Sequence, residues 1–453
     1  MVSQVYSMET NGRSLSGVTG LVPQMLSVFE AAGFAQMIQP GDTVAIKLHC
    51  GEWNNTAYLR PVYARALADR VKALGGKPFV CDTTTLTYGR NASRATGLDI
   101  LMTAERNGYT SATLGCPFIV ADGFNGTDDV IVDLPEGFIL KEAYIAKAIA
   151  LADVLITLTH FKGHGIGVIG GSIKNLGIGA QSKRGKYNVH MGGHPKYSLG
   201  AATDFHPERC KGRAGCPNWE VCETICPYGL FHVTETTITW DRTKCANCLA
   251  HFGANTACGV CNFPEITYKA TNAAMADACL ATVKAVGRQK VGFINMAIDI
   301  SPSCDCVGFA DMPIVPHLGV FASTDPVALD KATLDRAVQA PGMPGSAAVD
   351  YQAAQPGAHK FSAVSMMHFE GFSEEIQIET GALNGLGSKE YQIVKAEPIS
   401  DRKLWMFPDF RLPGVKFGPL YRKDDPFPWE RYGGQGFHRA EEVDLSLVDH
   451  PLD

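Results

Sequence analysis

The sequence predicts an α/β fold with mostly parallel sheets and helices on both faces, interrupted by a small inserted domain. Two observations support this prediction. Short apolar strands alternate with helices of apolar periodicity along most of the chain, which is typical of βαβ units. Eight of the 14 cysteines fall between Cys210 and Cys261, in a stretch of short irregular segments. We therefore expect an α/β domain in two parts (1–205 and 266–394), an insert (206–265) and a tail (395–453).

The hydrophobic pattern predicts each element of the α/β domain in turn. Residues 43–49 and 77–83 are apolar runs typical of buried strands, and residues 59–76 between them have helical spacing and end at two glycines. The same reasoning predicts helices at 139–152, 270–287 and 325–340, and strands at 153–160, 290–299 and 318–323. Asp325 and Pro326 are typical of the start of the last helix.

Composition narrows the function classes. The net charge of −6, without a Lys/Arg run, argues against nucleic-acid binding. No apolar run reaches the length of a membrane span. The N-terminus has no basic region followed by an apolar stretch, so we expect a cytoplasmic protein. In that compartment, clustered cysteines are typical of metal or redox sites rather than disulfides.

The cysteines of the insert form two sets. The first is Cys210, Cys216, Cys222 and Cys226, which precedes Pro227, and the second is Cys245, Cys248, Cys258 and Cys261. In two-cluster ferredoxins the fourth cysteine of each run ligates the other cluster. This spacing predicts two [4Fe–4S] clusters, one held by Cys210, Cys216, Cys222 and Cys261, the other by Cys245, Cys248, Cys258 and Cys226.

Two further features of the insert bear on this prediction. Residues 237–245 are typical of a short strand before the second set, and we expect metal rather than a hydrophobic core to hold the insert together. A pair of four-cysteine zinc sites is the alternative, because two CxxC pairs also describe a zinc ribbon. The eight cysteines and the Cys-x3-Cys-Pro sequence at 222–227 favour iron–sulfur.

Three loops that follow predicted strands carry candidate pocket residues. Residues 158–179 hold His160, His164, Lys174 and Asn175 among glycines, and His190 and His194 follow. Glycines let the backbone approach a ligand, and histidine and lysine supply a base, a metal ligand or a cation. The loop after 43–49 supplies Lys47, His49, Asn55 and Arg60, and the loop after 290–299 supplies Cys304, Asp305 and Cys306. Each segment also has an interpretation without a functional role. These are glycine-rich turns for 158–179, a solvated loop after 43–49, and ordinary buried thiols after 290–299.

These segments, in order over roughly residues 40–395, resemble a widespread prokaryotic iron–sulfur-centre family that is uncharacterised and often carries a ferredoxin insert. The resemblance implies an α/β domain plus two [4Fe–4S] clusters, and the wide cysteine gaps depart from the regular spacing of that family. His160, Gly170-Gly171, Lys174 and His190/His194 are also similar to a pattern in nickel-pincer lactate racemases. That similarity implies a cofactor anchor at Lys174 and proton or metal groups at the histidines.

Three functions follow as expectations. The first is an oxidoreductase whose clusters relay electrons to a pocket at the strand-end loops, where a small molecule is reduced and a histidine or Lys174 donates a proton. The second is a non-catalytic electron-transfer or cofactor-assembly partner. The third is a racemase-like isomerase with structural clusters. We expect a ferredoxin-like redox partner protein. The aromatic, proline-rich tail is expected to wrap a surface or to form a subunit contact in a homo-oligomer.

Overall fold

The structure is a computed structural model that describes residues 2–9, 19–86, 93–248, 258–262, 264–365, 372–401, 439–440, 442–444 and 446. The chain divides into two units, Met1–Leu404 and Trp405–Asp453. The tail predicted at 395–453 therefore lies mostly outside the described residues. Within the described part of the chain, no helix is long and apolar enough to cross a lipid bilayer.

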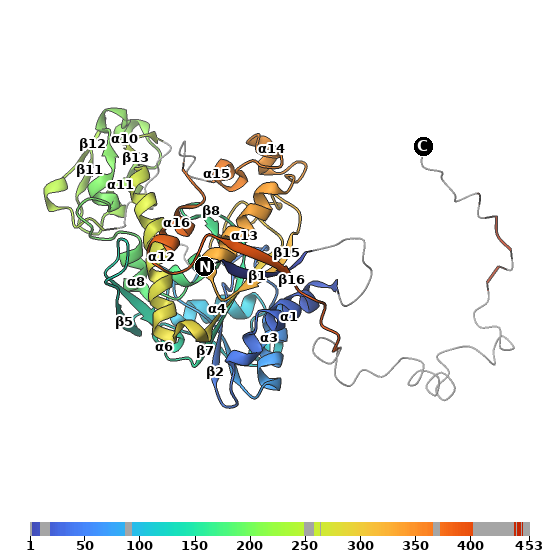
Figure 1. Cartoon of the computed structure of the whole chain (residues 1–453). Coiled ribbons are helices and arrows are strands. Elements are labelled where there is room, and N and C mark those ends of the chain that lie inside the picture. The colour runs from blue at the N-terminus through green and yellow to red at the C-terminus, as the bar shows by residue number, and fades with distance from the viewer. Residues whose placement is uncertain are drawn as a thin grey trace. The chain divides into compact units, whose positions relative to one another are not determined.

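An eight-stranded sheet forms the centre of the first unit, in the order β16-β1-β15-β14-β7-β2-β3-β4 (Figure 1). The strands are β1 (Ser3–Glu9), β2 (Thr43–Lys47), β3 (Lys77–Asp82), β4 (Phe118–Val120), β7 (Val154–His160), β14 (Val291–Ala297), β15 (Gly319–Ser323) and β16 (Tyr391–Lys395). The five strands from β14 to β4 run parallel, and β15 is antiparallel to both β14 and β1. The predicted α/β fold with a mostly parallel sheet is confirmed.

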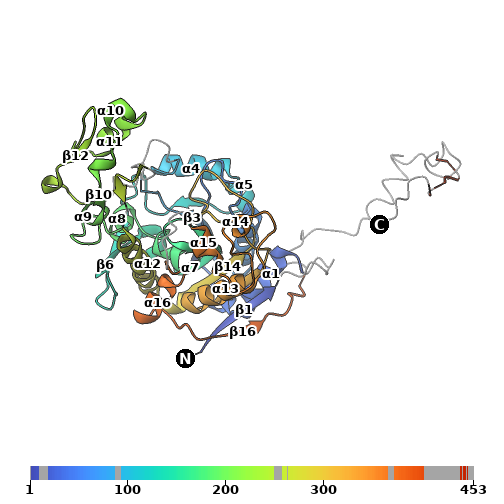
Figure 2. The same cartoon turned by 90° about the horizontal axis from the view of Figure 1, so that it is seen from above.

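Helices cover both faces of this sheet. On one face, α1 (Leu21–Ala31) packs against α3 (Pro61–Ala73). A second group of helices packs together around α7 (Ser172–Gly177) and consists of α7, α12 (Glu265–Val286), α13 (Pro326–Gln339) and α16 (Ile376–Leu383) (Figure 2). The crossovers from β2 to β3 and from β7 to β14 move in opposite directions along the sheet. Because such crossovers are right-handed, they place their helices on opposite faces.

The remaining regular elements are short. They are α2 (Phe34–Met37), α4 (Gly97–Arg106), α5 (Ser111–Leu114), α8 (Lys183–Val189), α9 (Leu199–Ala202), α14 (Ala347–Asp350), α15 (Lys360–Val364) and the hairpin of β8 (Lys162–His164) and β9 (Val168–Gly170). The predicted start of α13 is confirmed, because the Asp325 carboxylate accepts the backbone N–H groups of Val327 and Ala328 at 2.9 and 3.0 Å.

The helix predicted at 139–152 is wrong. This segment instead forms β6 (Glu142–Ala146) followed by one helical turn, α6 (Lys147–Ala150). β6 pairs antiparallel with β5 (Asp129–Asp133), and Ala143 and Ile145 are buried while Tyr144 between them is partly exposed. Apolar residues at these positions fit either period, and pairing with β5 selects the strand.

The insert begins and ends at a two-stranded ladder of β10 (Asp204–Phe205) and β13 (Cys261–Asn262). It contains α10 (Gly212–Gly215), α11 (Trp219–Ile225) and a hairpin of β11 (Phe231–Val233) and β12 (Ile238–Trp240), the strand predicted before the second cysteine set. The expectation that metal alone holds the insert needs correction. Phe231 and Trp240 stack with ring centroids 5.1 Å apart inside a small apolar core.

Candidate functional site

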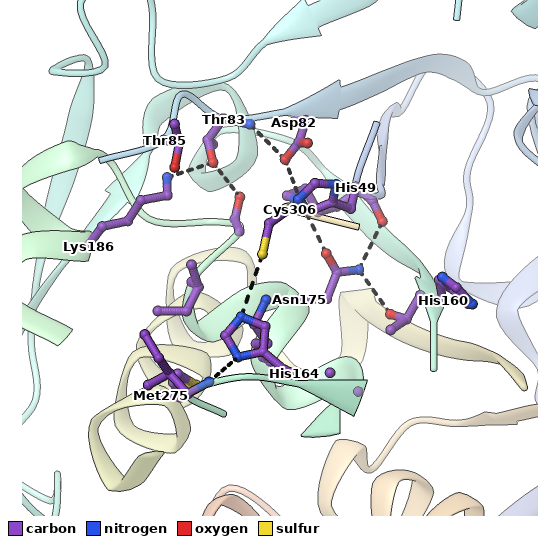
Figure 3. A pocket seen from close by; sticks show the side chains of 18 of the residues that line it. His49, Asp82, Thr83, Thr85, His160, His164, Asn175, Lys186, Met275 and Cys306 are labelled. Carbon is purple, nitrogen blue, oxygen red and sulfur yellow. Dashed lines mark hydrogen bonds and ion pairs between the residues drawn. The ribbon is translucent and has the colours of Figure 1, made fainter. Parts of the chain in front are cut away.

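A cavity of about 290 Å³ opens at the carboxyl ends of β2, β3 and β7 (Figure 3). The neighbouring strands β2 and β7 are the point where the crossovers diverge toward opposite edges of the sheet. Such a switch point leaves a crevice between the diverging loops, where open α/β sheets bind ligands. Three of the predicted pocket residues, Lys47, His49 and His160, line the cavity at the ends of these strands.

Cationic side chains dominate the wall of the cavity. The cations are Lys47, Arg94, Lys162, Lys174 and Lys186, and Asp82 is the one carboxylate on the wall among the described residues. Three of the cations have carboxylate partners: Lys47 Nζ lies 2.9 Å from Asp82 Oδ1, Arg94 Nε lies 3.0 Å from Glu52 Oε2, and Lys162 Nζ lies 3.3 Å from Asp305 Oδ2.

Lys174 and Lys186 differ from the other three cations. Within the described residues, neither forms an ion pair with a carboxylate. Lys174 Nζ lies 3.5 Å from Cys304 Sγ, and Lys186 Nζ donates to Thr83 Oγ1 at 2.7 Å. Burial lowers the pKa of Lys186 to about 8, and the nearby Asp122 offsets only part of this effect. Lys186 can therefore release and regain a proton near neutral pH.

Burial keeps two predicted histidines of the cavity in the neutral form. It lowers the pKa of His49 to about 3 and that of His190 to about 4. His49 Nδ1 accepts the N–H of Gly51 at 3.0 Å, so the ring proton is on Nε2. His190 Nδ1 donates to the carbonyl of Lys186 at 2.7 Å, so its proton is on Nδ1.

Two more of the predicted histidines, His160 and His194, have partners within the protein. His160 Nε2 donates to the carbonyl of Ile298 at 2.9 Å, and its Nδ1 lies 2.8 Å from Asp305 Oδ1. Both ring nitrogens are thus used within the protein. His194 does not line the cavity. Its Nδ1 accepts the N–H of Tyr197 at 3.0 Å, and its ring stacks on that of Tyr197.

Cys304 and Cys306 lie in the loop after β14, and Cys306 lines the cavity. Asp305 between them is fully buried and is fixed by His160 and Lys162, while its carbonyl accepts the N–H of Glu52 at 2.8 Å. Figure 3 shows the Cys306 sulfur directed at His164, 3.6 Å from Nε2. One ligand atom from each of His164, Cys304 and Cys306 lies within 4.8 Å of the others, which is close enough for a single metal ion.

The remaining predicted pocket residues divide into two groups. Asn175 lines the cavity, where its Oδ1 accepts from Lys47 Nζ at 3.1 Å. Asn55 and Arg60 do not line it. The Asn55 amide donates to the carbonyls of Val307 and Phe309 and so holds the loop of Cys304 and Cys306. Arg60 forms a half-exposed ion pair with Asp299 before α3.

Sequence reasoning missed several cavity residues: Asp82, Thr83, Thr85, Arg94 and Lys186. A signal existed for Asp82 and Thr83, because they are the last two residues of the strand predicted at 77–83 and parallel strands place their carboxyl ends at one edge of the sheet. Lys186 stands four residues before His190 and would share its helix face. Arg94 has no such signal, because its pairing with Glu52 joins loops that are 42 positions apart.

Five cysteines of the insert line a second cavity, of about 400 Å³: Cys210, Cys216, Cys222, Cys258 and Cys261. Burial raises the pKa of Cys261 to about 12, and nearby Cys222 and Cys258 add to this effect. Four of these five, Cys210, Cys216, Cys222 and Cys261, are the cysteines predicted for the first cluster. Cys258 lines the same cavity, although the spacing assigned it to the other cluster.

A second group contains Cys226, Cys245 and Cys248. Burial raises the pKa of the Cys245 thiol, and the nearby Cys248 and Cys226 raise it further. Cys226 belongs to the first run of cysteines in the sequence, whereas Cys245 and Cys248 belong to the second.

Helix α8 connects the first cavity with the second cysteine group. Lys186 on α8 lines the cavity, while the next residue, Tyr187, lies near Cys248, which together with burial raises its pKa. Just after α8, the N–H of Gly193 donates to the carbonyl of Asn247 at 2.8 Å. One turn of helix therefore has a residue at each site.

Comparison with known proteins gives a family and a distant structural likeness. The family model described as "Domain of unknown function (DUF362)" matches residues 44–335, more than half of the chain. None of the curated proteins matches the chain. Among solved structures, the lactate racemase apoprotein from Thermoanaerobacterium thermosaccharolyticum is similar with a TM-score of 0.34 and 13% identity over 71% of this chain. The match covers 57% of that protein, a little over half of its length.

Proposed function

The chain belongs to the family described as a domain of unknown function (DUF362), and we propose that this member is an iron–sulfur oxidoreductase. In this proposal the insert holds two [4Fe–4S] clusters, and a small organic anion is reduced in the cavity at the end of β2 and β7. A ferredoxin-like protein is the proposed electron donor. The observation that carries the proposal is the position of α8, with Lys186 at the cavity and Tyr187 near Cys248.

The cysteine arrangement fits cubane clusters better than zinc. Tetrahedral Zn–S bonds of about 2.3 Å place the four sulfurs roughly 3.8 Å apart. Within the described part of the chain, no three of the eight insert cysteines bring their Sγ atoms within 4.8 Å of one another. Thiols that gather in two groups at a wider spacing fit an iron–sulfur cubane better than a single zinc ion. Such clusters supply one-electron transfer when bound.

Two cubanes need eight thiolates, and the insert supplies eight. We assign Cys210, Cys216, Cys222 and Cys261 to the first cluster, since all four line one cavity. The second cluster would be held by Cys226, Cys245, Cys248 and Cys258. Cys258 is the one cysteine of that cavity that the first cluster does not need.

The charges of the cavity support an anionic substrate and a proton source. Lys174 and Lys186 are more than nine-tenths buried and have no carboxylate ion partner among the described residues, so a substrate carboxylate would complete their pairing. Lys186, with a pKa of about 8, can donate a proton during reduction. Buried charged groups around a cavity favour an enzyme over a partner protein that only transfers electrons.

The proposal is tested by reductive titration of anaerobically purified protein with dithionite, followed by EPR. We expect two interacting reduced clusters in the native chain and one in Cys222→Ser. Cys279→Ser, which removes a buried thiol of α12, is the matched control and should keep both signals. A native chain that takes up no electrons, or a Cys222→Ser spectrum equal to the native one, would exclude the proposal.

A further inference from the structure

We propose that Cys304 and Cys306 form a redox-active dithiol in the wall of the cavity, which reduces small anionic organic disulfides. Cys306 is the attacking sulfur, because it lines the cavity, and Cys304 is the resolving sulfur, because it is buried behind it. The inference concerns the α/β domain alone and does not depend on the clusters proposed for the insert.

The first argument is the position of the two sulfurs. They belong to a group whose atoms all lie within 4.8 Å of one another, in a loop that is held from several sides. Asp305 between them is bound by His160 and Lys162, and Asn55 binds the carbonyls just beyond. The N–H of Val307 donates to the carbonyl of Cys304 at 3.1 Å, so both cysteines belong to one tight turn that is clamped from both sides.

The second argument is that a nitrogen donor faces each sulfur. Lys174 Nζ lies 3.5 Å from Cys304 Sγ, and His164 Nε2 lies 3.6 Å from Cys306 Sγ. Lys174 has no carboxylate ion partner in the described residues, so a thiolate is its available counter-charge. Cationic neighbours of this kind are typical of reactive cysteines and not of inert buried ones.

The hydrogen bonds of the His164 ring favour a dithiol over a metal site. His164 Nδ1 accepts the N–H groups of Ile166 at 3.1 Å and Gly167 at 2.7 Å. The ring proton is therefore on Nε2, the nitrogen that faces Cys306. A metal-binding histidine needs the opposite arrangement, in which the second nitrogen donates its proton to an acceptor. Here Nε2 donates a hydrogen bond to sulfur instead of offering a lone pair.

The charged groups around Cys304 and Cys306 favour a state in which the two sulfurs share one negative charge. The groups that face it are Lys162, His164, Lys174, Arg94, His49 and Asp305. Burial alone would raise the pKa of Cys304, but the hydrogen bond from Cys306 and the charges of Lys174 and Lys162 lower it well below its ordinary value. That hydrogen bond and burial raise the pKa of Cys306. The two sulfurs thus titrate as a pair that holds a single proton near neutral pH.

The reaction balances in two steps. Cys306 passes its proton to Cys304 and then, as the thiolate, attacks one sulfur of a disulfide R–S–S–R. The S–S bond of that disulfide breaks, and one RS⁻ leaves and takes the proton from Cys304 as a mixed disulfide forms on Cys306. Cys304 then attacks the Cys306 sulfur and expels the second RS⁻, which leaves a Cys304–Cys306 disulfide. The cysteine pair loses two electrons and its single proton, and the organic disulfide becomes one thiol and one thiolate.

The experiment uses the full chain under anaerobic conditions, with 2,2′-dithiodiacetate as the anionic probe and cystamine as a cationic disulfide of similar size. Mass mapping of the peptide with both cysteines reads the reaction without interference from the insert. We expect a Cys304–Cys306 disulfide that dithiothreitol reverses and that forms at least ten times faster with the anionic probe. Absence of this disulfide, or equal rates for the two probes, would overturn the proposal.

Three variants separate the roles of the two cysteines. Cys304→Ser should trap the mixed disulfide of Cys306 with 2-mercaptoacetate, because the resolving thiol is gone, and Cys306→Ser should give no adduct. Lys174→Met should slow disulfide formation and shift its rate profile to higher pH. Cys116→Ser, outside the cavity wall, should react like the native chain. If zinc binds one per chain and is lost in both cysteine variants but not in Cys116→Ser, the site is a metal site and the dithiol proposal is wrong.

Discussion

The Lys47 ammonium and the Asp82 carboxylate form a fully buried ion pair, with 2.9 Å between Nζ and Oδ1, at the ends of neighbouring parallel strands. Asp82 Oδ2 also accepts the N–H of Cys50, and Lys47 Nζ donates to Asn175 Oδ1. The pair therefore joins three of the loops that form the cavity. These contacts fix the two charged side chains at the carboxyl ends of β2 and β3.

Asp82→Asn is expected to lower the free energy of unfolding by about 3–5 kcal/mol, because it leaves the buried Lys47 without a counter-charge. Urea unfolding at pH 7 measures the loss. Asp69→Asn is the matched control, since it breaks the exposed pair with Arg65 and should cost less than about 1 kcal/mol. Similar losses in the two variants would contradict the importance of burial.

The lowered pKa of Lys186 predicts a pH-dependent stability. Its value is about 8 in the folded chain and about 10.4 when unfolded, so between these values the unfolded state binds more protons. Stability from this group then rises with pH, by up to about 3 kcal/mol. Native protein should gain this amount relative to Lys186→Met between pH 7 and pH 10. A difference between the two proteins that does not vary with pH would show that Lys186 titrates normally.

Gly171→Ala is expected to displace α7 and to lower the free energy of unfolding by about 1–3 kcal/mol. A Cβ atom at Gly171 would lie 2.5 Å from the Asp330 carboxylate, which accepts the N–H groups of Ser172 and Ile173 at the start of that helix. Gly170→Ala is the control, because its Cβ would meet the flexible Lys162 side chain at 3.2 Å. Thermal unfolding should rank the control above Gly171→Ala, and the reverse order would refute this role of Asp330.

Iron analysis of Cys226→Ser and Cys258→Ser tests the ligand assignment. The two variants should each lose about one cluster of iron, because both residues are assigned to the second cluster. Cys258→Ser is the decisive variant, because the structure places Cys258 beside Cys222 and Cys261, which are assigned to the first cluster. Full iron content in Cys258→Ser, with loss in Cys226→Ser, would mean that the second cluster uses three cysteines.

The central strands and their helices could be predicted because their residues are buried on one side or on both. All seven residues of β7 and of β14 are buried, so their apolar runs have one interpretation. The prediction for residues 139–152 failed because their apolar residues fit both a helix and a strand, and only pairing with β5, which lies outside that segment, decides between them. The edge strand β16 and its neighbour β1 carry polar residues, and neither was predicted.

Lys47 and His160, the last residues of β2 and β7, were among the predicted pocket residues and line the cavity, whereas Asp82 at the end of β3 was missed. The site could not be predicted where function depends on pairing between distant loops. Arg94 with Glu52 is one example, and the hydrogen bonds that fix the ring proton of His164 are another. The sequence grouped His194 with the pocket by spacing alone, whereas the chain turns after α8 and carries it away from the cavity.

The most direct test of the account is the iron and acid-labile sulfide content of anaerobically purified chain. Two cubane clusters predict about eight iron and eight sulfide per chain. About two zinc ions per chain, with no sulfide, would contradict the proposed oxidoreductase.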